Sequence, residues 1–323
     1  MQLTFKNVGH GDSIILEWDS DNQNRIGIID VNLYQNSNPV LEYIRNTKPN
    51  KIEFIFLSHP HIDHYSGLFE LLQYCENNNI NINILATTCH RDPRYIYWSD
   101  IDFDNKTLLK KIIILSEKLY NNGMITFYGT VNAPYEIPLN NEISLKFLAP
   151  DHKEVEEYAR IVDIKKNYNV NECSKAANIL STIIQIYSNA WCILLTSDAT
   201  KTSLERIYSR NIIDSLNSKL LLVQVPHHGS ISNHFNLLWD LYQNQNIDAV
   251  ISCGLNEKYK LPSYPVIKYF FNSGYNIKAT NIVYGMVQFK EKWSKRMVNR
   301  SELLDIISTP ITHKPQDLTY EIK

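Results

Sequence analysis

The sequence lacks most features that would assign it at once to a disulfide-linked, thiolate-metal or membrane class. Its five cysteines are odd in number, widely spaced and never arranged as CxxC, which argues against a disulfide framework and a thiolate zinc finger. No apolar run reaches the roughly eighteen residues of a membrane span. The first residues, MQLTFKNVGHGDS, lack the basic and apolar regions of a secretion signal. We therefore expect a cytoplasmic protein without membrane insertion, whose cysteines are small core residues.

An excess of one charge is also missing. Lys and Arg number 32 against 34 Asp and Glu, so the formal charge is −2 and no general basic field attracts nucleic acid. Any site for a polyanion must therefore be local. Repeats at solenoid periods are absent, and apart from the Asn-rich run ENNNININ there is no low-complexity segment. With 323 residues, 44% of them hydrophobic, the chain can bury a sizeable core in one large domain or two ordinary ones.

Short β-rich runs and amphipathic segments alternate along the chain. MQLTF, SIILEW and RIGIID predict an antiparallel meander, and helical periodicity at residues 38–48 leads into the buried strand KIEFIFLS. After a polar stretch at 151–175 that interrupts the pattern, strands resume in NILSTIIQIY, AWCILLTSD, KLLLVQVPHHGS, IDAVISCG and YGMVQF. This order predicts an α/β (α+β) fold, with two sheets packed as a sandwich and helices outside it.

Metal-ligand residues are concentrated in SHPHIDHYSG, directly after the strand KIEFIFLS. His59 and His61 are two residues apart, so an extended chain leaving the strand places both on one side, where they can hold one ion. Asp63 and His64 fall where the chain turns into a helix and can point at a second ion. Imidazole and carboxylate without thiolate suit zinc, manganese or iron. An exposed polar turn is the alternative, but four such residues behind an apolar strand are hard to satisfy otherwise.

Similar residues end three further predicted strands. KLLLVQVPHHGS ends in His227 and His228, and AWCILLTSD ends in Asp198, from which a bridging carboxylate would reach both ions. Asp30 ends RIGIID, and we expect it to accept a hydrogen bond from a ligand histidine or to cap the strand end.

With these residues in view, the sequence resembles the metallo-β-lactamase superfamily, whose HxHxDH signature is matched by His59, His61, Asp63 and His64. VGHGDSIILEW, NILSTIIQI, LLTSDA, VPHHGS and ISCGLNEKYKLP also resemble successive blocks of ComEC-type DNA-uptake hydrolase domains and their soluble relatives. The resemblance implies a four-layer αββα sandwich with a metal site along one edge of the sheets. It implies a hydrolase domain at residues 1–290, followed by a basic and polar extension at 291–323.

The resemblance also implies a site with two divalent ions, zinc or manganese. His59 and His61 would hold the first ion, and Asp63, His64 and His227 the second, with Asp198 bridging. Asp63 would also orient the attacking hydroxide, and His228 would be the catalytic neighbour, although the order of His227 and His228 stays open. Three further residues are expected to contact the ligands: Asp12, Asp30 and Asn178.

The sequence departs from the superfamily pattern in two places. A third histidine for the first ion has no obvious counterpart, because the corresponding segment starts at Asn178 and reads NILS. His90 or His152 could fill the position from a flanking loop, although both suit a surface location better. The late YGHP-like block reads YKLP at residues 259–262 and lacks its histidine, which removes a candidate proton donor.

The expected activity is hydrolysis by a metal-bound hydroxide, with a phosphodiester, most plausibly DNA, as substrate. The helix start at Ser66 and Gly67 offers N–H groups to an anion, and four residues are expected to bind substrate: Ser230, Arg91, Arg94 and Trp98. His227 follows Asp198 by only 29 positions, which leaves no room for the inserted domain of RNA-processing relatives. Alternatives are a small-molecule esterase or lactonase, a cyclic-nucleotide phosphodiesterase, or a degenerate interaction module.

Two further expectations concern partners. A DNA-uptake or defence role, with a protein partner encoded nearby, follows from the resemblance alone. The most basic stretch, KEKWSKRMVNR, could be a polyanion patch, but a solvated helix face is the simpler interpretation.

Overall fold

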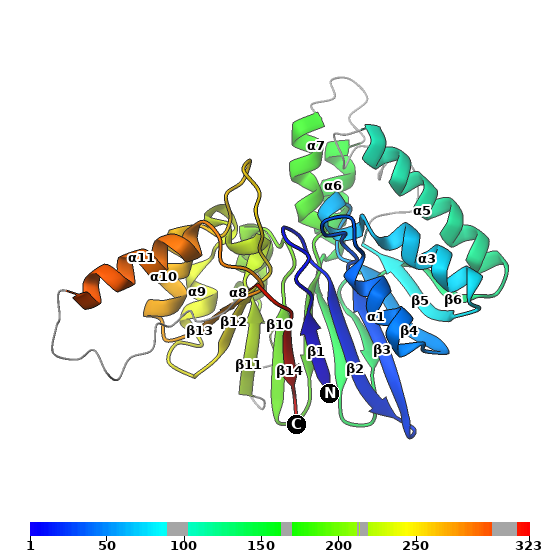
Figure 1. Ribbon diagram of the computed structural model, residues 1–323, viewed down its shortest axis with the longest axis horizontal. Coiled ribbons are helices and arrows are strands. Elements are labelled where there is room, and N and C mark those ends of the chain that lie inside the picture. The colour runs from blue at the N-terminus through cyan, green and yellow to red at the C-terminus, as the bar shows by residue number, and fades with distance from the viewer. Residues whose placement is uncertain (89–102, 163–169, 212, 214–218, 299–314) are drawn as a thin grey trace.

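The computed structural model describes residues 1–88, 103–162, 170–211, 213, 219–298 and 315–323 (Figure 1). Within these residues, the strands form two sheets of seven. The first sheet has the order β14 (Leu318–Glu321), β1 (Gln2–Phe5), β2 (Ile14–Ser20), β3 (Gln23–Ile29), β4 (Lys51–Leu57), β5 (Asn81–Thr87) and β6 (Ile125–Thr130). The second has the order β13 (Asn276–Ala279), β12 (Asp248–Ile251), β11 (Lys219–Gln224), β10 (Trp191–Leu195), β9 (Ile183–Tyr187), β8 (Ser144–Ala149) and β7 (Tyr135–Pro138).

Each sheet changes from antiparallel to parallel pairing at one internal strand. In the first sheet β14, β1, β2 and β3 pair antiparallel, and β3 to β6 pair parallel. In the second sheet β7 to β10 pair antiparallel, and β10 to β13 pair parallel. The carboxyl ends of parallel strands meet at one edge of a sheet, so both sheets gather strand-end residues there.

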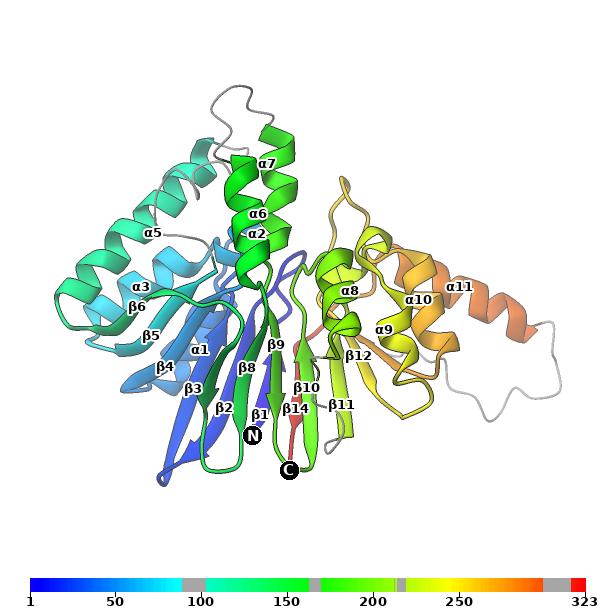
Figure 2. The same ribbon diagram turned by 180° about the vertical axis from the view of Figure 1, so that it is seen from behind.

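Helices cover the outer face of each sheet (Figures 1 and 2). The first sheet carries α1 (Pro39–Thr47), α2 (Ile62–Tyr65), α3 (Leu68–Asn77) and α5 (Phe103–Asn121), and α6 (His152–Val162) and α7 (Val170–Ala177) pack into the same outer core. The second carries α8 (Lys201–Ser209), α9 (Asn236–Asp240), α10 (Tyr264–Asn272) and α11 (Gly285–Val298). Both views show α6 and α7 rising above the upper edge of the sandwich.

Strand residues alternate between an inner core and two outer cores. In β10, Ile193 and Leu195 lie in the core between the sheets, while Cys192 and Leu194 lie under the helices of the second sheet. Phe54 and Phe56 of β4 stack in the inner core with ring centroids 4.4 Å apart. A sheet buried on both faces explains why the runs read as nearly continuous apolar segments.

The predicted α+β sandwich with helices outside it is confirmed. One predicted strand is wrong: YGMVQF lies at the start of helix α11, where residues from Gly285 onward are helical. The polar stretch 151–175 is not patternless, because it contains α6 and the start of α7, whose buried residues include Tyr158 and Val162. Both helices are short and highly charged, which masked their periodicity.

The boundary predicted at residue 290 stays a prediction. Helix α11 runs through that position, and β14 from the C-terminal part pairs with β1 at the edge of the first sheet. The four described cysteines, Cys75, Cys173, Cys192 and Cys253, are buried in the core, as predicted. None of the helices that the structure describes has both the length and the hydropathy of a membrane span.

Candidate metal centre

The predicted ligands converge where parallel strands of the two sheets end. His59, His61, Asp63 and His64 follow β4 and continue into α2, Asp198 follows β10, and His227 and His228 follow β11. Asp198 lies at the centre of this group, which we call the His–Asp cluster. The cluster is almost entirely inaccessible at its base, where His59, His64, Asp198 and His228 are all buried.

The two oxygens of Asp198 face different histidines. Oδ1 lies 3.4 Å from Nε2 of His228 and 3.6 Å from Nε2 of His64. Oδ2 lies 3.5 Å from Nε2 of His227 and 3.8 Å from Nε2 of His59. We refer to these two arrangements as the Oδ1 side and the Oδ2 side. A carboxylate placed in this way can bridge two ions.

Protein acceptors fix the orientation of the histidine rings on the Oδ1 side. Nδ1 of His64 donates to Oδ2 of Asp30 at 2.7 Å, and Nδ1 of His228 donates to the carbonyl of Ser252 at 3.0 Å. Because these acceptors hold the Nδ1 protons, Nε2 of each ring is left as an acceptor facing Asp198. A carboxylate or carbonyl behind the ring is the usual support of a metal-binding histidine.

On the Oδ2 side, His59 and His61 are arranged in the same way. The hydroxyl of Ser58 donates to Asp30 at 2.6 Å, so it accepts from Nδ1 of His59, which lies 3.2 Å away. Nε2 of His61 donates to the carbonyl of Ser174 in α7 at 2.8 Å. The remaining nitrogens, Nε2 of His59 and Nδ1 of His61, face each other at 3.0 Å.

The loops that carry the cluster adopt an unfavourable backbone conformation. His227 and His228 have φ of 48° and 53°, Asp30 has φ of 61°, and Ser197 next to Asp198 has φ of 43°. Residues with side chains rarely adopt this left-handed region, and such strain is concentrated at functional sites. The backbone N–H of His227 donates to the carbonyl of Ser197 at 2.9 Å, which holds the β11 loop against the β10 loop.

The donor set fits divalent metal ions. Nε2 of His64, Nε2 of His228 and Oδ1 of Asp198 are buried without a hydrogen-bond partner, although Oδ1 lies 3.6 Å from the first nitrogen and 3.4 Å from the second. Buried polar atoms are normally paired. Two ligands about 2.0–2.2 Å from one tetrahedral ion lie about 3.3–3.6 Å apart, so this spacing suits ligands of a common ion. Among the described residues, four such groups occur, and each contains at least one predicted site residue.

Proximity shifts the pKa values of the cluster in opposite directions. Burial raises the pKa of Asp198, but the charges of His227, His228 and His64 outweigh it and hold that pKa well below its usual value. Burial, with the neighbouring His64 and His61, lowers the pKa of His59. Burial also lowers the pKa of His228, but Asp198 and Asp63 reverse this and raise it to about 9. Without an ion, the cluster therefore balances its carboxylates with protonated imidazole.

Two of the three residues expected to contact the ligands lie beside histidines of the cluster, and Asp12 contacts Gln224. Asp30 supports His64, and Asn178 lies with its Nδ2 3.4 Å from Nδ1 of His227. Oδ2 of Asp12 accepts from Gln224 at 2.9 Å, and its Oδ1 is buried without a partner. Asp12 also forms a candidate ligand group with Asp198 and His228.

The expected substrate-binding residues are placed less directly. Arg91, Arg94 and Trp98 lie outside the described residues, as does His90. Ser230 is near the cluster, and its hydroxyl pairs with that of Ser232 at 2.8 Å. His152 is 84% exposed and pairs with Glu156, so it does not supply the third histidine. The anion site at Ser66 and Gly67 is not formed, because the N–H of Ser66 donates to the carbonyl of Ile62 at 2.9 Å and that of Gly67 to the carbonyl of Val31 at 2.8 Å.

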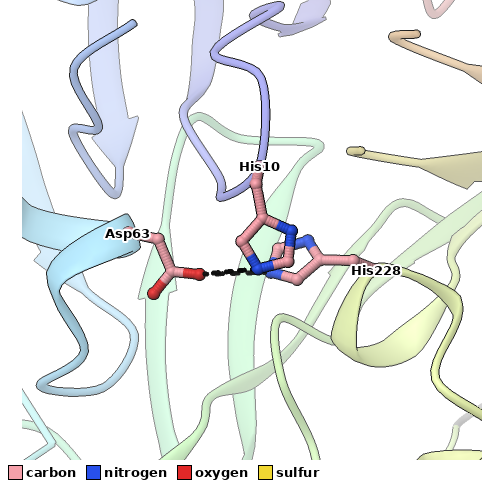
Figure 3. A group of neighbouring side chains, drawn as sticks. All are labelled: His10, Asp63 and His228. Atoms are coloured by element: carbon pink, nitrogen blue, oxygen red, sulfur yellow. Dashed lines mark ion pairs between the residues drawn. The ribbon is translucent and has the colours of Figure 1, made fainter. Parts of the chain in front are cut away.

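Sequence reasoning missed His10, in the loop between β1 and β2. Its Nε2 lies 3.4 Å from Oδ2 of Asp63, and its ring lies 4.5 Å from that of His228 (Figure 3). The only signal in the sequence is the histidine between the two glycines of VGHGDS, next to a block that the resemblance already singles out. No sequence pattern marks the residues that support the cluster. Ser174 and Ser252 act through their backbone carbonyls, which any residue could supply. Ser58 and Gln224 lie at the ends of apolar strands.

A comparison with family models finds the metallo-beta-lactamase superfamily at residues 16–148, which includes His59 to His64. The match covers less than half of the chain, and together with the two packed sheets it shows the metallo-β-lactamase fold. The fold typically binds two divalent metal ions, and the cluster has the donors for them. The narrower relation to ComEC-type hydrolases stays a prediction. No curated protein matches the chain.

Solved structures share the fold at low identity. YhfI from Bacillus subtilis is 12% identical with a TM-score of 0.45, covering 86% of this chain and 95% of that one. Zn(2+)-bound PqqB from Methylobacterium extorquens is 8% identical with a TM-score of 0.46, covering 86% and 98%. A mutant of the CmlA beta-hydroxylase is 10% identical with a TM-score of 0.44. The match covers 99% of this chain and 54% of that protein. Likeness at this level says nothing about substrate.

Proposed function

We propose that the protein is a metal-dependent hydrolase that cleaves a phosphodiester bond, with DNA as the leading substrate. The observation that carries the proposal is the convergence on Asp198 of imidazoles from both sheets, with free nitrogens aimed at its two oxygens. Such a donor set has little structural use of its own, because it leaves buried polar atoms unpaired.

The geometry supports one ion on each side of Asp198. His59, His61 and His227 would hold the ion on the Oδ2 side, and Asp63, His64 and His228 the ion on the Oδ1 side. In this arrangement His227 supplies the third imidazole that the sequence seemed to lack, and His228 takes the place that the resemblance gave to His227. Bound there, the ions would supply a hydroxide nucleophile and stabilise the developing negative charge.

The chain itself contributes orientation and exclusion of water. Asp30 and the carbonyl of Ser252 fix the proton-bearing nitrogens of His64 and His228, so neither ring can turn its acceptor away. Ser58 and Ser197 join their hydroxyls at 2.8 Å beneath the cluster. Asp63 is more exposed than Asp198, so its carboxylate is the one placed to contact a substrate or an attacking water.

The rim of the cluster offers contacts for a nucleotide. Tyr259, 52% exposed, stacks on His10 with ring centroids 5.9 Å apart, and Nζ of Lys258 lies 4.7 Å from the Tyr259 ring centre. Aromatic rings with neighbouring cations bind single-stranded nucleic acid by base stacking and phosphate contact. These contacts favour a nucleotide over a neutral ester. A role in DNA uptake or defence beside a separately encoded partner is part of the proposal that rests on the sequence resemblance.

The experiment is digestion of linear and circular DNA with added Mn²⁺ or Zn²⁺ by the wild-type protein, His61→Ala and Tyr259→Ala. We expect cleavage by the wild type, its loss in His61→Ala, and weaker binding of single-stranded oligonucleotides by Tyr259→Ala, by about tenfold because stacking on one base contributes about 1–3 kcal/mol. Binding should also weaken steeply as salt is raised.

Other results would redirect the proposal. Hydrolysis of small phosphodiesters or carboxylic esters without DNA cleavage would establish the small-molecule enzyme. A wild-type protein that binds no divalent metal would refute the hydrolase and leave the interaction module.

A further inference from the structure

His10 projects into the cluster from a loop that the superfamily signature does not include. Its Nε2 lies 3.4 Å from Oδ2 of Asp63, and Oδ2 of Asp63 lies 3.7 Å from Nε2 of His228. Figure 3 shows both rings turned toward the Asp63 carboxylate, each from a different part of the chain. One nitrogen from each ring and one oxygen of Asp63 all lie within 4.8 Å of one another, close enough to share an ion.

The loop is built to hold His10 in this place. Gly9 and Gly11 on either side of it have φ of 69° and 122°, which only glycine adopts readily. A Cβ on Gly11 would lie 2.2 Å from the carbonyl oxygen of Asp63, so the His10 loop and the Asp63 turn are in backbone contact. The backbone N–H of Asp12 donates to that same carbonyl at 3.2 Å.

The opposite side of the loop is equally constrained. Nδ2 of Asn32 donates to the carbonyl of His10 at 2.8 Å. A Cβ on Gly254 would lie 2.2 Å from the carbonyl carbon of Gly9, so the loop after β12 also touches the His10 loop. Contacts from three separate segments therefore fix the position of one side chain, which is what a preorganised ligand requires.

The spacing distinguishes a ligand from a supporting hydrogen bond. The 3.4 Å between His10 and Asp63 is longer than the 2.7–3.2 Å of a normal N–H···O bond. It matches the separation of about 3.3–3.6 Å expected for two ligands of one tetrahedral ion. The hydrogen bonds that Asp30 and the carbonyl of Ser252 accept within the cluster are 2.6–3.0 Å long, shorter than the distance between His10 and Asp63.

We propose that His10 is a ligand of the metal ion on the Oδ1 side, together with Asp63 and His228. The inference rests on the proposed function, because it adds an imidazole to the same site. It makes the ion on the Oδ1 side richer in nitrogen donors than the superfamily signature alone predicts, with His10, His64 and His228 around it.

The experiment measures metal binding and not activity. The full chain, stripped with a chelator and dialysed, is titrated with Mn²⁺ and with Co²⁺, for the wild type, His10→Ala and His10→Gln. We expect the wild type to bind two equivalents, and both variants to bind one of them at least tenfold more weakly, since even outer partners of ligands contribute about 10–100-fold. The visible spectrum of bound Co²⁺ should change as one nitrogen ligand is lost.

His152→Ala is the matched control, because it removes an exposed histidine that pairs only with Glu156 among the residues described. It should bind both ions as the wild type does. Thermal melting of the metal-free proteins shows whether His10→Gln, which keeps a side chain of similar length, is folded. A folded His10→Gln with two equivalents at wild-type affinity and an unchanged Co²⁺ spectrum would overturn the ligand role and leave the hydrolase proposal intact. A wild type that binds no metal would overturn both.

Discussion

The two sides of Asp198 differ in how completely the protein prepares them. On the Oδ1 side, His64 and His228 are buried, held from behind by Asp30 and Ser252, and present unpaired nitrogens. On the Oδ2 side, Nε2 of His59 and Nδ1 of His61 face each other at 3.0 Å, and the His227 side chain is 21% exposed. The Oδ1 side is therefore enclosed and fixed from behind, whereas the Oδ2 side is partly open.

This difference predicts unequal affinities. A site whose ligands are already held in place loses little conformational freedom on binding, while a site with a partly exposed side chain must first order it, which reduces the gain. We expect the first equivalent of metal to occupy the Oδ1 side and the second, weaker one the Oδ2 side.

The largest effect should come from Asp198→Ala, because Asp198 faces both sides. We expect loss of both high-affinity equivalents and a decrease in any hydrolytic rate on the order of a thousandfold, since metal stabilisation contributes several kcal/mol. Metal titration and rate measurement on the same preparation check this. Glu205→Ala, which removes a carboxylate of an exposed pair with Lys201, is the control. Retention of two equivalents in Asp198→Ala would show that it does not bridge.

The histidine pair separates the two sides. His228→Ala should weaken the tighter equivalent, and His227→Ala the weaker one, each by at least about 10–100-fold. Double-mutant cycles on the free energy of metal binding sharpen the comparison, because the effects of substitutions at two ligands of one ion are not additive. We expect coupling between His228→Ala and His64→Ala. We also expect it between His227→Ala and His59→Ala. Coupling of His227→Ala with His64→Ala would instead place His227 on the Oδ1 side, as the sequence resemblance implied.

Support from behind the ring should have an intermediate effect. Asp30→Asn removes the charged acceptor of His64 and should weaken metal binding by about 10–100-fold. The affected equivalent should be the tighter one, which isothermal titration resolves. If only the weaker equivalent changed, Asp30 would act through its bonds to Ser58 and His59 and not through His64.

The last effect concerns a histidine outside the cluster, and it should change stability and not metal binding. His234 is buried against Tyr269 and Phe270 with both ring nitrogens unpaired, and burial lowers its pKa from 6.5 to about 4. The unfolded chain takes up this proton as the pH falls below 6.5, so folding stability is lost between pH 6.5 and 4. In metal-free protein, His234→Phe should reduce that loss by up to about 3 kcal/mol. Equal pH dependence of melting in both proteins would contradict this.

The sequence predicted the sandwich and most of the cluster because both depend on local patterns. Strands buried on both faces read as continuous apolar runs, and HxHxDH places four ligands by spacing alone. YGMVQF failed because a short apolar run does not distinguish a strand from the first turns of a buried helix. The roles of His227 and His228 could not be predicted, since two left-handed residues in succession decide which oxygen of Asp198 each ring faces. His10 depends on a contact between the β1–β2 loop and the Asp63 turn, which no local pattern encodes.

The hydroxyl bridge between Ser58 and Ser197 lies where the two sheets meet beneath the cluster. Ligands above it come from the first sheet through β4 and from the second through β10 and β11. A bound ion therefore cross-links two layers that otherwise adhere through their apolar inner faces, and any opening of the sandwich at this edge must release it. The melting temperature of the whole protein should accordingly rise with free metal concentration, so that the thermal stability of the sandwich reports the occupancy of the candidate metal site at this edge.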